Sequence, residues 1–161
     1  MSAQITLDMP TVETKYFGSM SYEENVVVEF PQGLPGFETE HRFLILTQAA
    51  SNPLVFVQSI ATPGLCFVAA PVLAVRPDYV LSVAAEDLAL VELPTDTQPK
   101  IGCEVLVLAI LSLAEDATPT LNLLGPIVVN LRNRRAVQAV QTEGRYSHRE
   151  PVDAAQEPVC S

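Results

Sequence analysis

The chain of 161 residues has no tryptophan, two histidines and three cysteines, and these shortages argue against several kinds of chemistry. His41 and His148 lie more than a hundred positions apart, and no H-E-x-x-H, G-x-S-x-G or P-loop motif is present. Three cysteines without a C-x-x-C pair favour a reducing cytoplasm over a secreted disulfide scaffold. We therefore expect a binding protein without cofactor or metal site rather than an enzyme.

Long apolar runs are also missing. The most apolar stretch, Val105–Ala114, contains ten residues, whereas a membrane-spanning helix needs roughly 18. The N-terminus has neither the basic nor the apolar region of a signal peptide. We expect a cytoplasmic protein with no membrane contact, in which Val105–Ala114 forms a buried strand.

Positive charge is scarce over most of the chain. Up to Leu131 there are 4 basic and 15 acidic residues, and from Arg132 onwards there are 5 basic and 4 acidic residues, which gives a net charge of -10. An acidic body repels nucleic-acid phosphates and attracts basic partners. A basic protein is therefore the favoured partner, ahead of DNA or RNA.

Short apolar runs, cut by segments that contain proline and glycine, predict the architecture. We expect one domain over residues 14–150 between a flexible N-terminus, residues 1–13, and a flexible tail, residues 151–161. Runs rich in Val, Ile, Leu and Phe are typical of strands, so the sequence predicts an all-β fold, a small antiparallel β-barrel-like domain. Strands are expected at Asn25–Phe30, Arg42–Leu46, Leu54–Ile60, Leu65–Ala70, Tyr79–Val83, Val105–Ala114, Ile127–Leu131 and Ala136–Gln141.

One segment, Ala84–Leu93, has helical spacing. Leu88 and Val91 share a face, and two acids, Glu86 and Asp87, lie in the first turn, where the helix dipole favours negative charge. With Ser82 as a candidate N-cap, we expect a single short helix of one or two turns.

The arginine-rich segment Arg132–Arg135 lies between two expected strands and is predicted to be a hairpin tip. The alternative is a small β-barrel that binds nucleic acid through this tip. Nucleic-acid grooves usually combine a broad basic surface with aromatic stacking platforms, and neither is visible here. A solvated hairpin tip is therefore the favoured interpretation.

Polar residues stand beside several apolar runs. Gln58, Asn122 and Asn130 each close or interrupt an expected strand, where amide side chains usually satisfy backbone groups of a turn. Phe37 and Glu38 follow the turn "GLPG". Phe37 either plugs one end of the barrel or forms part of a partner surface, and plugging is favoured because large aromatic side chains usually pack.

Two motifs in this order resemble the FliW family of flagellar assembly factors. One is Phe-Pro-x-Gly-Leu-Pro-Gly-Phe-Glu at Phe30–Glu38, and the other is Asn-Leu-x-x-Pro-Ile-x-x-Asn at Asn122–Asn130. The resemblance extends over about Lys15–Val152, nearly the whole expected domain.

The resemblance implies a cytoplasmic, non-enzymatic protein that is monomeric when free. It implies two partners: flagellin, which the family holds before export, and CsrA, a small basic RNA-binding dimer that represses flagellin translation. Freed of flagellin, such a protein captures CsrA and relieves repression without touching nucleic acid, and the charge of -10 suits a basic partner. The candidate partner-binding residues are Phe37, Glu38, Phe56, Gln58, Asn122, Pro126 and Asn130.

Overall fold

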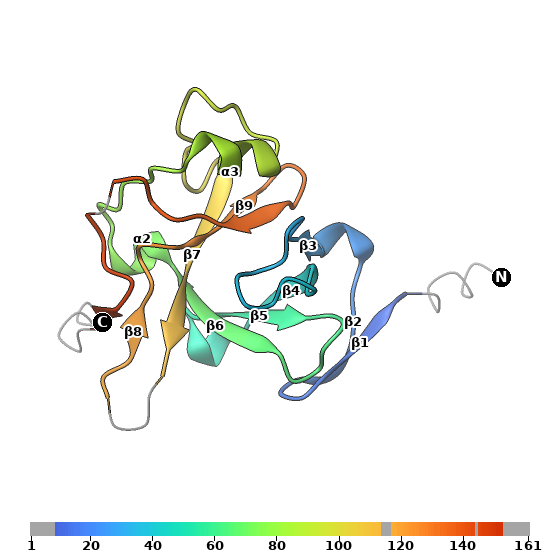
Figure 1. Cartoon of the computed structure of the whole chain (residues 1–161). Coiled ribbons are helices and arrows are strands. Elements are labelled where there is room, and N and C mark those ends of the chain that lie inside the picture. The colour runs from blue at the N-terminus through green and yellow to red at the C-terminus, as the bar shows by residue number, and fades with distance from the viewer. Residues whose placement is uncertain (1–8, 114–116, 144, 153–161) are drawn as a thin grey trace.

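The computed structural model describes residues 9–113, 117–143 and 145–152, and its main feature is one strongly curved antiparallel sheet (Figure 1). The strand order is β10-β9-β7-β6-β5-β4-β3, with β8 paired to both β7 and β11 and with β1–β2 as a separate hairpin. The strands are β1 Thr11–Thr14, β2 Gly18–Ser21, β3 Val28–Glu29, β4 Arg42–Thr47, β5 Val55–Ser59, β6 Cys66–Pro71, β7 Val105–Ser112, β8 Thr120–Leu121, β9 Ile127–Asn130, β10 Ala136–Gln138 and β11 Glu150–Pro151. The helices are η1 Glu24–Val26, η2 Ala49–Ser51, α2 Val72–Val75 and α3 Ala85–Leu90.

The two ends of the curved sheet meet at one point. Glu29 in β3 forms a single parallel bridge with Arg135, just before β10, and its N–H donates to the Arg134 carbonyl at 2.9 Å. One bridge does not make a ladder, so the sheet is not closed into a true barrel. The expected all-β antiparallel fold is confirmed, with the barrel left open along this seam.

Strand β7 is buried on both faces, which explains why its sequence is continuously apolar. Val107 and Ala109 pack in one core cluster with Leu88 of α3, whereas Leu108 packs in a second cluster with Phe43. Each fully buried aliphatic side chain contributes about 1.5–3 kcal/mol. The strand therefore joins the two larger clusters of the hydrophobic core.

The N-terminal hairpin covers the convex side of the sheet. Val12 of β1 packs with Tyr22 and with Leu44 of β4 in a third, smaller cluster. Strand β1 thus begins within the segment expected to be flexible, three residues before the expected domain boundary at residue 14. Residues 1–8 and 153–161, which carry most of the expected flexible ends, lie outside the described residues.

The prediction of a strand at Tyr79–Val83 is wrong. Only an isolated bridge joins Val83 to Gln141, because the Gln141 side chain takes the place of a strand partner. Its Oε1 accepts hydrogen bonds from the Ser82 backbone N–H at 2.6 Å and from the Ser82 hydroxyl at 2.8 Å. The same bonds occupy Ser82, so the N-cap of α3 is Ala84, without a side-chain cap bond.

Other elements differ in extent. The expected strand Asn25–Phe30 is a turn of 3-10 helix, η1, followed by the two residues of β3. The helix α3 is confirmed at Ala85–Leu90 with Leu88 buried, and α2 is a second short helix that the sequence pattern did not indicate. Strand β10 ends at Gln138, earlier than expected.

The turn after β3 requires two glycines, and they allow a matched test. Gly33 and Gly36 both have a positive φ, at 69° and 86°, but a Cβ on Gly33 would lie 2.6 Å from the Glu38 carbonyl oxygen, whereas a Cβ on Gly36 meets nothing within 4 Å. Gly36→Ala should cost about 1–2 kcal/mol from backbone strain alone. Gly33→Ala should cost about 3 kcal/mol or more, because the backbone of Glu38 must also move. Urea unfolding of both variants measures the difference, and equal destabilisation would contradict this account of the turn.

Candidate partner-binding surface

The turn that carries Phe37 and Glu38 stands at the surface. Leu34 and Phe37 form an isolated bridge, with the Phe37 N–H donating to the Leu34 carbonyl at 2.7 Å. The Glu38 carboxylate accepts the Gly36 N–H at 3.0 Å, and this hydrogen bond lowers the pKa of Glu38. Glu38 therefore stays ionised. Its carboxylate and the neighbouring Phe37 ring are both exposed, so a partner can contact them.

Phe37 ends a row of aromatic rings that leads from the surface into the core. Its ring lies 5.5 Å from that of Phe67 in an edge-to-face contact, Phe67 lies 6.3 Å from Phe43, and Phe43 lies 5.3 Å from the fully buried Phe30. Phe37 itself is 41% exposed. The expectation that Phe37 plugs the barrel is therefore wrong, since the ring lies against Phe67 at the surface.

Phe56 and Gln58 point to the convex side of β5, under the N-terminal hairpin. Phe56 is half-buried, with its ring 5.3 Å from that of Phe17. Gln58 is fully buried, and its Nε2 donates to the carbonyls of Ser59 at 3.0 Å and Pro63 at 3.1 Å. Gln58 fixes the turn between β5 and β6 in this conformation and is not accessible to a partner.

A hydrogen-bond network beside Gln58 ties this turn to the segment before β4. The Glu40 carboxylate accepts the Ser59 hydroxyl at 2.5 Å and the Thr62 hydroxyl at 2.6 Å. The Ser59 bond is the larger cause of a lowered Glu40 pKa, with Thr62 adding to it. The ionised Glu40 side chain thus fixes the β5–β6 turn to the segment before β4.

The second motif begins with a side-chain turn. The Asn122 Oδ1 accepts the Gly125 N–H at 2.8 Å, and the Gln138 Nε2 donates to the Gly125 carbonyl at 2.9 Å. Pro126 is buried, and its carbonyl accepts the Ala139 N–H at 2.9 Å. Asn122 and Gln138 are half-buried and flank Gly125, whereas Pro126 serves the start of the β9–β10 pairing.

Asn130 closes the motif and is 1% exposed. Its Nδ2 donates to the Val91 carbonyl at 2.7 Å, and its Oδ1 accepts the Arg132 N–H at 2.9 Å. The residue therefore joins the end of β9 to the end of α3 and shapes the hairpin tip. A partner does not reach it in this conformation.

The arginine-rich tip is confirmed as the hairpin between β9 and β10, and it packs against Glu92. Arg135 lies 3.6 Å from the Glu92 carboxylate, and the Asn133 Nδ2 donates to the same carboxylate at 3.0 Å. Arg132 reaches the Glu92 carbonyl at 3.4 Å. Glu92 is 40 positions from Arg132 in the chain, so the sequence pattern gave no sign of this contact.

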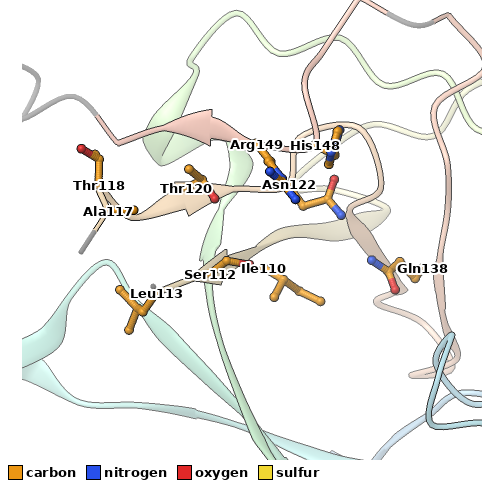
Figure 2. Close-up of a pocket in the computed structure, with 10 residues that line it drawn as sticks. All are labelled: Ile110, Ser112, Leu113, Ala117, Thr118, Thr120, Asn122, Gln138, His148 and Arg149. Atoms are coloured by element: carbon orange, nitrogen blue, oxygen red, sulfur yellow. The ribbon is translucent and has the colours of Figure 1, made fainter. Parts of the chain in front are cut away.

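A cleft of about 520 Å³ opens where β7, β8 and the segment after residue 146 come together (Figure 2). Figure 2 shows side chains from all three segments around it, with Asn122 beside His148 and Arg149. Of the residues expected to bind a partner, only Asn122 lies here. Sequence reasoning missed Gln138, His148 and Arg149, since nothing in their spacing links them to Asn122. The lining residues are Ile110, Ser112, Leu113, Ala117, Thr118, Thr120, Asn122, Gln138, His148 and Arg149.

The described residues, 9–113, 117–143 and 145–152, contain neither a cluster of metal ligands nor a membrane-spanning helix. No group of three or more His, Cys, Asp or Glu side chains in that part of the chain is arranged to hold a metal ion. No helix within the same residues is long and apolar enough to cross a membrane.

Comparison with known proteins identifies the family. The family model described as "FliW protein" matches residues 11–152. The chain belongs to the FliW family. The flagellar assembly factor FliW of Treponema pallidum is 33% identical over 148 residues, covering 89% of this chain and 91% of that protein. The FliW of Bacillus subtilis is 30% identical over 142 residues, covering 88% of this chain and 95% of that protein.

The fold agrees with the same family. A crystal structure of the flagellar assembly factor FliW superimposes with a TM-score of 0.76 at 29% identity, covering 91% of this chain and 99% of that chain. The FliW match begins at residue 11, where β1 begins, and ends at residue 152, next to β11. The N-terminal hairpin and the β8–β11 pair are thus part of the FliW domain.

The exposure of Phe37 predicts a modest stability cost for its removal. Phe37→Ala should lower the free energy of unfolding by about 1–2 kcal/mol, since the ring loses one aromatic contact and part of its burial. Phe30→Ala, at the buried end of the aromatic row, should cost about 3–5 kcal/mol. Chemical denaturation of the two variants provides the comparison. If Phe37→Ala lowered the free energy of unfolding as much as Phe30→Ala, Phe37 would be a core residue that plugs the barrel after all.

Proposed function

We propose that this chain is a non-enzymatic, cytoplasmic flagellar assembly factor that binds flagellin before export and, when free, binds CsrA and relieves its repression of flagellin translation. The observation that carries the proposal is membership of the FliW family over residues 11–152. The relatives are named flagellar assembly factors, a role that requires contact with other proteins. Flagellin and CsrA are the partners that the family resemblance implies.

The charge of the chain supports the CsrA part of the proposal. At -10, the protein attracts a basic dimer over a distance set by the Debye length, about 8 Å at physiological salt. The same field repels RNA phosphates. The arginine tip offsets this repulsion only in part, because the Arg135 guanidinium lies 3.6 Å from the Glu92 carboxylate. Capture of CsrA itself, without contact to its RNA, is the interaction that this charge favours.

A direct test uses purified components. The tagged chain is mixed with purified flagellin, with purified CsrA and with a short RNA at near-physiological salt, and complexes are measured by fluorescence anisotropy and size-exclusion chromatography. We expect complexes with flagellin and with CsrA and no measurable complex with RNA. Binding of RNA alone, at sub-micromolar concentration, would replace the proposal with the nucleic-acid-binding alternative.

The CsrA complex should also show electrostatic steering. Opposite charge raises the association rate constant, and salt screens this effect, so the rate constant should fall steeply between low and high salt while the dissociation rate changes little. Stopped-flow mixing at several salt concentrations measures both. An association rate that does not respond to salt would mean that the acidic body plays no part in recognising CsrA.

A further inference from the structure

Strands β6 and β7 pair over only part of their length and diverge beyond it. Pairing between them is confined to Ala69–Pro71 and Leu108–Ile110. The preceding part of β6, Cys66–Val68, pairs only with β5, and the end of β7, Leu111–Ser112, pairs only with β8 among the described residues. We call the unpaired facing edges of Cys66–Val68 and Leu111–Ser112 the β6–β7 wedge, and Figure 1 shows the two strands diverging there.

The backbone of β6 is oriented toward the wedge. The Ser59 N–H donates to the Leu65 carbonyl at 2.9 Å, and hydrogen-bonded pairs alternate along an antiparallel ladder, so Phe67 directs its backbone polar groups to β5. The N–H groups of Cys66 and Val68 therefore point into the wedge. Natural proteins usually protect such an edge with charged residues or proline, and Cys66–Val68 contains neither.

The side chains around the wedge form an apolar side and a polar side. On the concave face, Phe67 and Ile110 are partly buried against the same core cluster, and the exposed Phe37 lies against Phe67. Beyond Ile110, the cleft of Figure 2 presents amide and hydroxyl groups and the guanidinium of Arg149. Among the described residues that line the cleft none is acidic, although the whole chain carries a charge of -10.

We propose that the β6–β7 wedge and the adjoining cleft bind an extended segment of a protein partner, which adds as a strand to the free edge of β6. An apolar side chain of that segment packs on Phe67 and Ile110, and an acidic group reaches Arg149. Main-chain hydrogen bonds to a sheet edge supply affinity in such complexes, and alternate side chains supply specificity. The guanidinium of Arg149 disfavours a basic group at its own position in the cleft.

The identity of the partner rests on the proposed function. CsrA is basic, so the acidic body attracts it and Arg149 repels it. The wedge is then the site for an extended segment of flagellin.

Two variants with matched controls test the assignment. Arg149→Glu reverses the charge in the cleft, and Arg145→Glu makes the same change four positions away, outside the cleft lining. Cys66→Pro removes an N–H that points into the wedge at the first residue of β6, a position that tolerates proline, and Cys66→Ala controls for the lost thiol. Circular dichroism and thermal melting establish that each variant is folded. If Cys66→Pro does not fold, the comparison of Arg149→Glu with Arg145→Glu alone tests whether the cleft binds flagellin.

Titration calorimetry with purified flagellin and with purified CsrA gives the result. Arg149→Glu and Cys66→Pro should each weaken flagellin binding by about tenfold or more and leave CsrA binding within about threefold of wild type. Both control variants should bind flagellin like wild type. If wild type and Arg149→Glu bind flagellin equally, or if Arg149→Glu weakens CsrA binding instead, the site assignment is overturned while the proposed function stands. If wild type binds no flagellin, the proposed function fails and the assignment fails with it.

Discussion

The burial of both faces of β7 is the constraint on which the rest of the structure depends. One face of this strand packs with Leu88 of α3, and the other packs with the core that contains Phe43. The same strand pairs with β6, β8 and β9, so the sheet curves around it. Because the interior of the curved sheet is filled by side chains, partners can contact only its exposed segments. The Phe37 turn and the cleft lined by Arg149 are two of these segments.

Several of the residues expected to bind a partner serve this frame instead. Gln58 and Asn130 are buried and bind backbone groups of neighbouring turns, and Asn122 forms the turn before β9. A buried amide that lost its partner would cost about 1–3 kcal/mol, which is reason enough for such residues to be present without any partner contact. Phe37 and Glu38 differ, since they stand at the surface at the end of a row of packed rings.

Much of the fold could be predicted from the sequence, because β4, β5, β6, β7 and β9 are short apolar runs between turn residues. The strand expected at Tyr79–Val83 failed, because Gln141, about 60 positions away, binds Ser82 through its side chain. The contact of the arginine tip with Glu92 was invisible for the same reason. The cleft could not be predicted either, since Asn122, Gln138 and Arg149 come together only after the chain has folded. Periodicity reports which residues are buried, not which distant side chains meet.

We propose that a buried frame presents the protein's partners with surfaces at its exposed segments. Amide hydrogen exchange of the free chain, the flagellin complex and the CsrA complex tests this claim most directly. The account predicts that the amides of β7 and β9 exchange slowest in all three states, and that each partner adds protection only at exposed segments. Faster exchange of the Gln58 and Asn130 amides on binding would contradict it, because the partners would then act by opening the core.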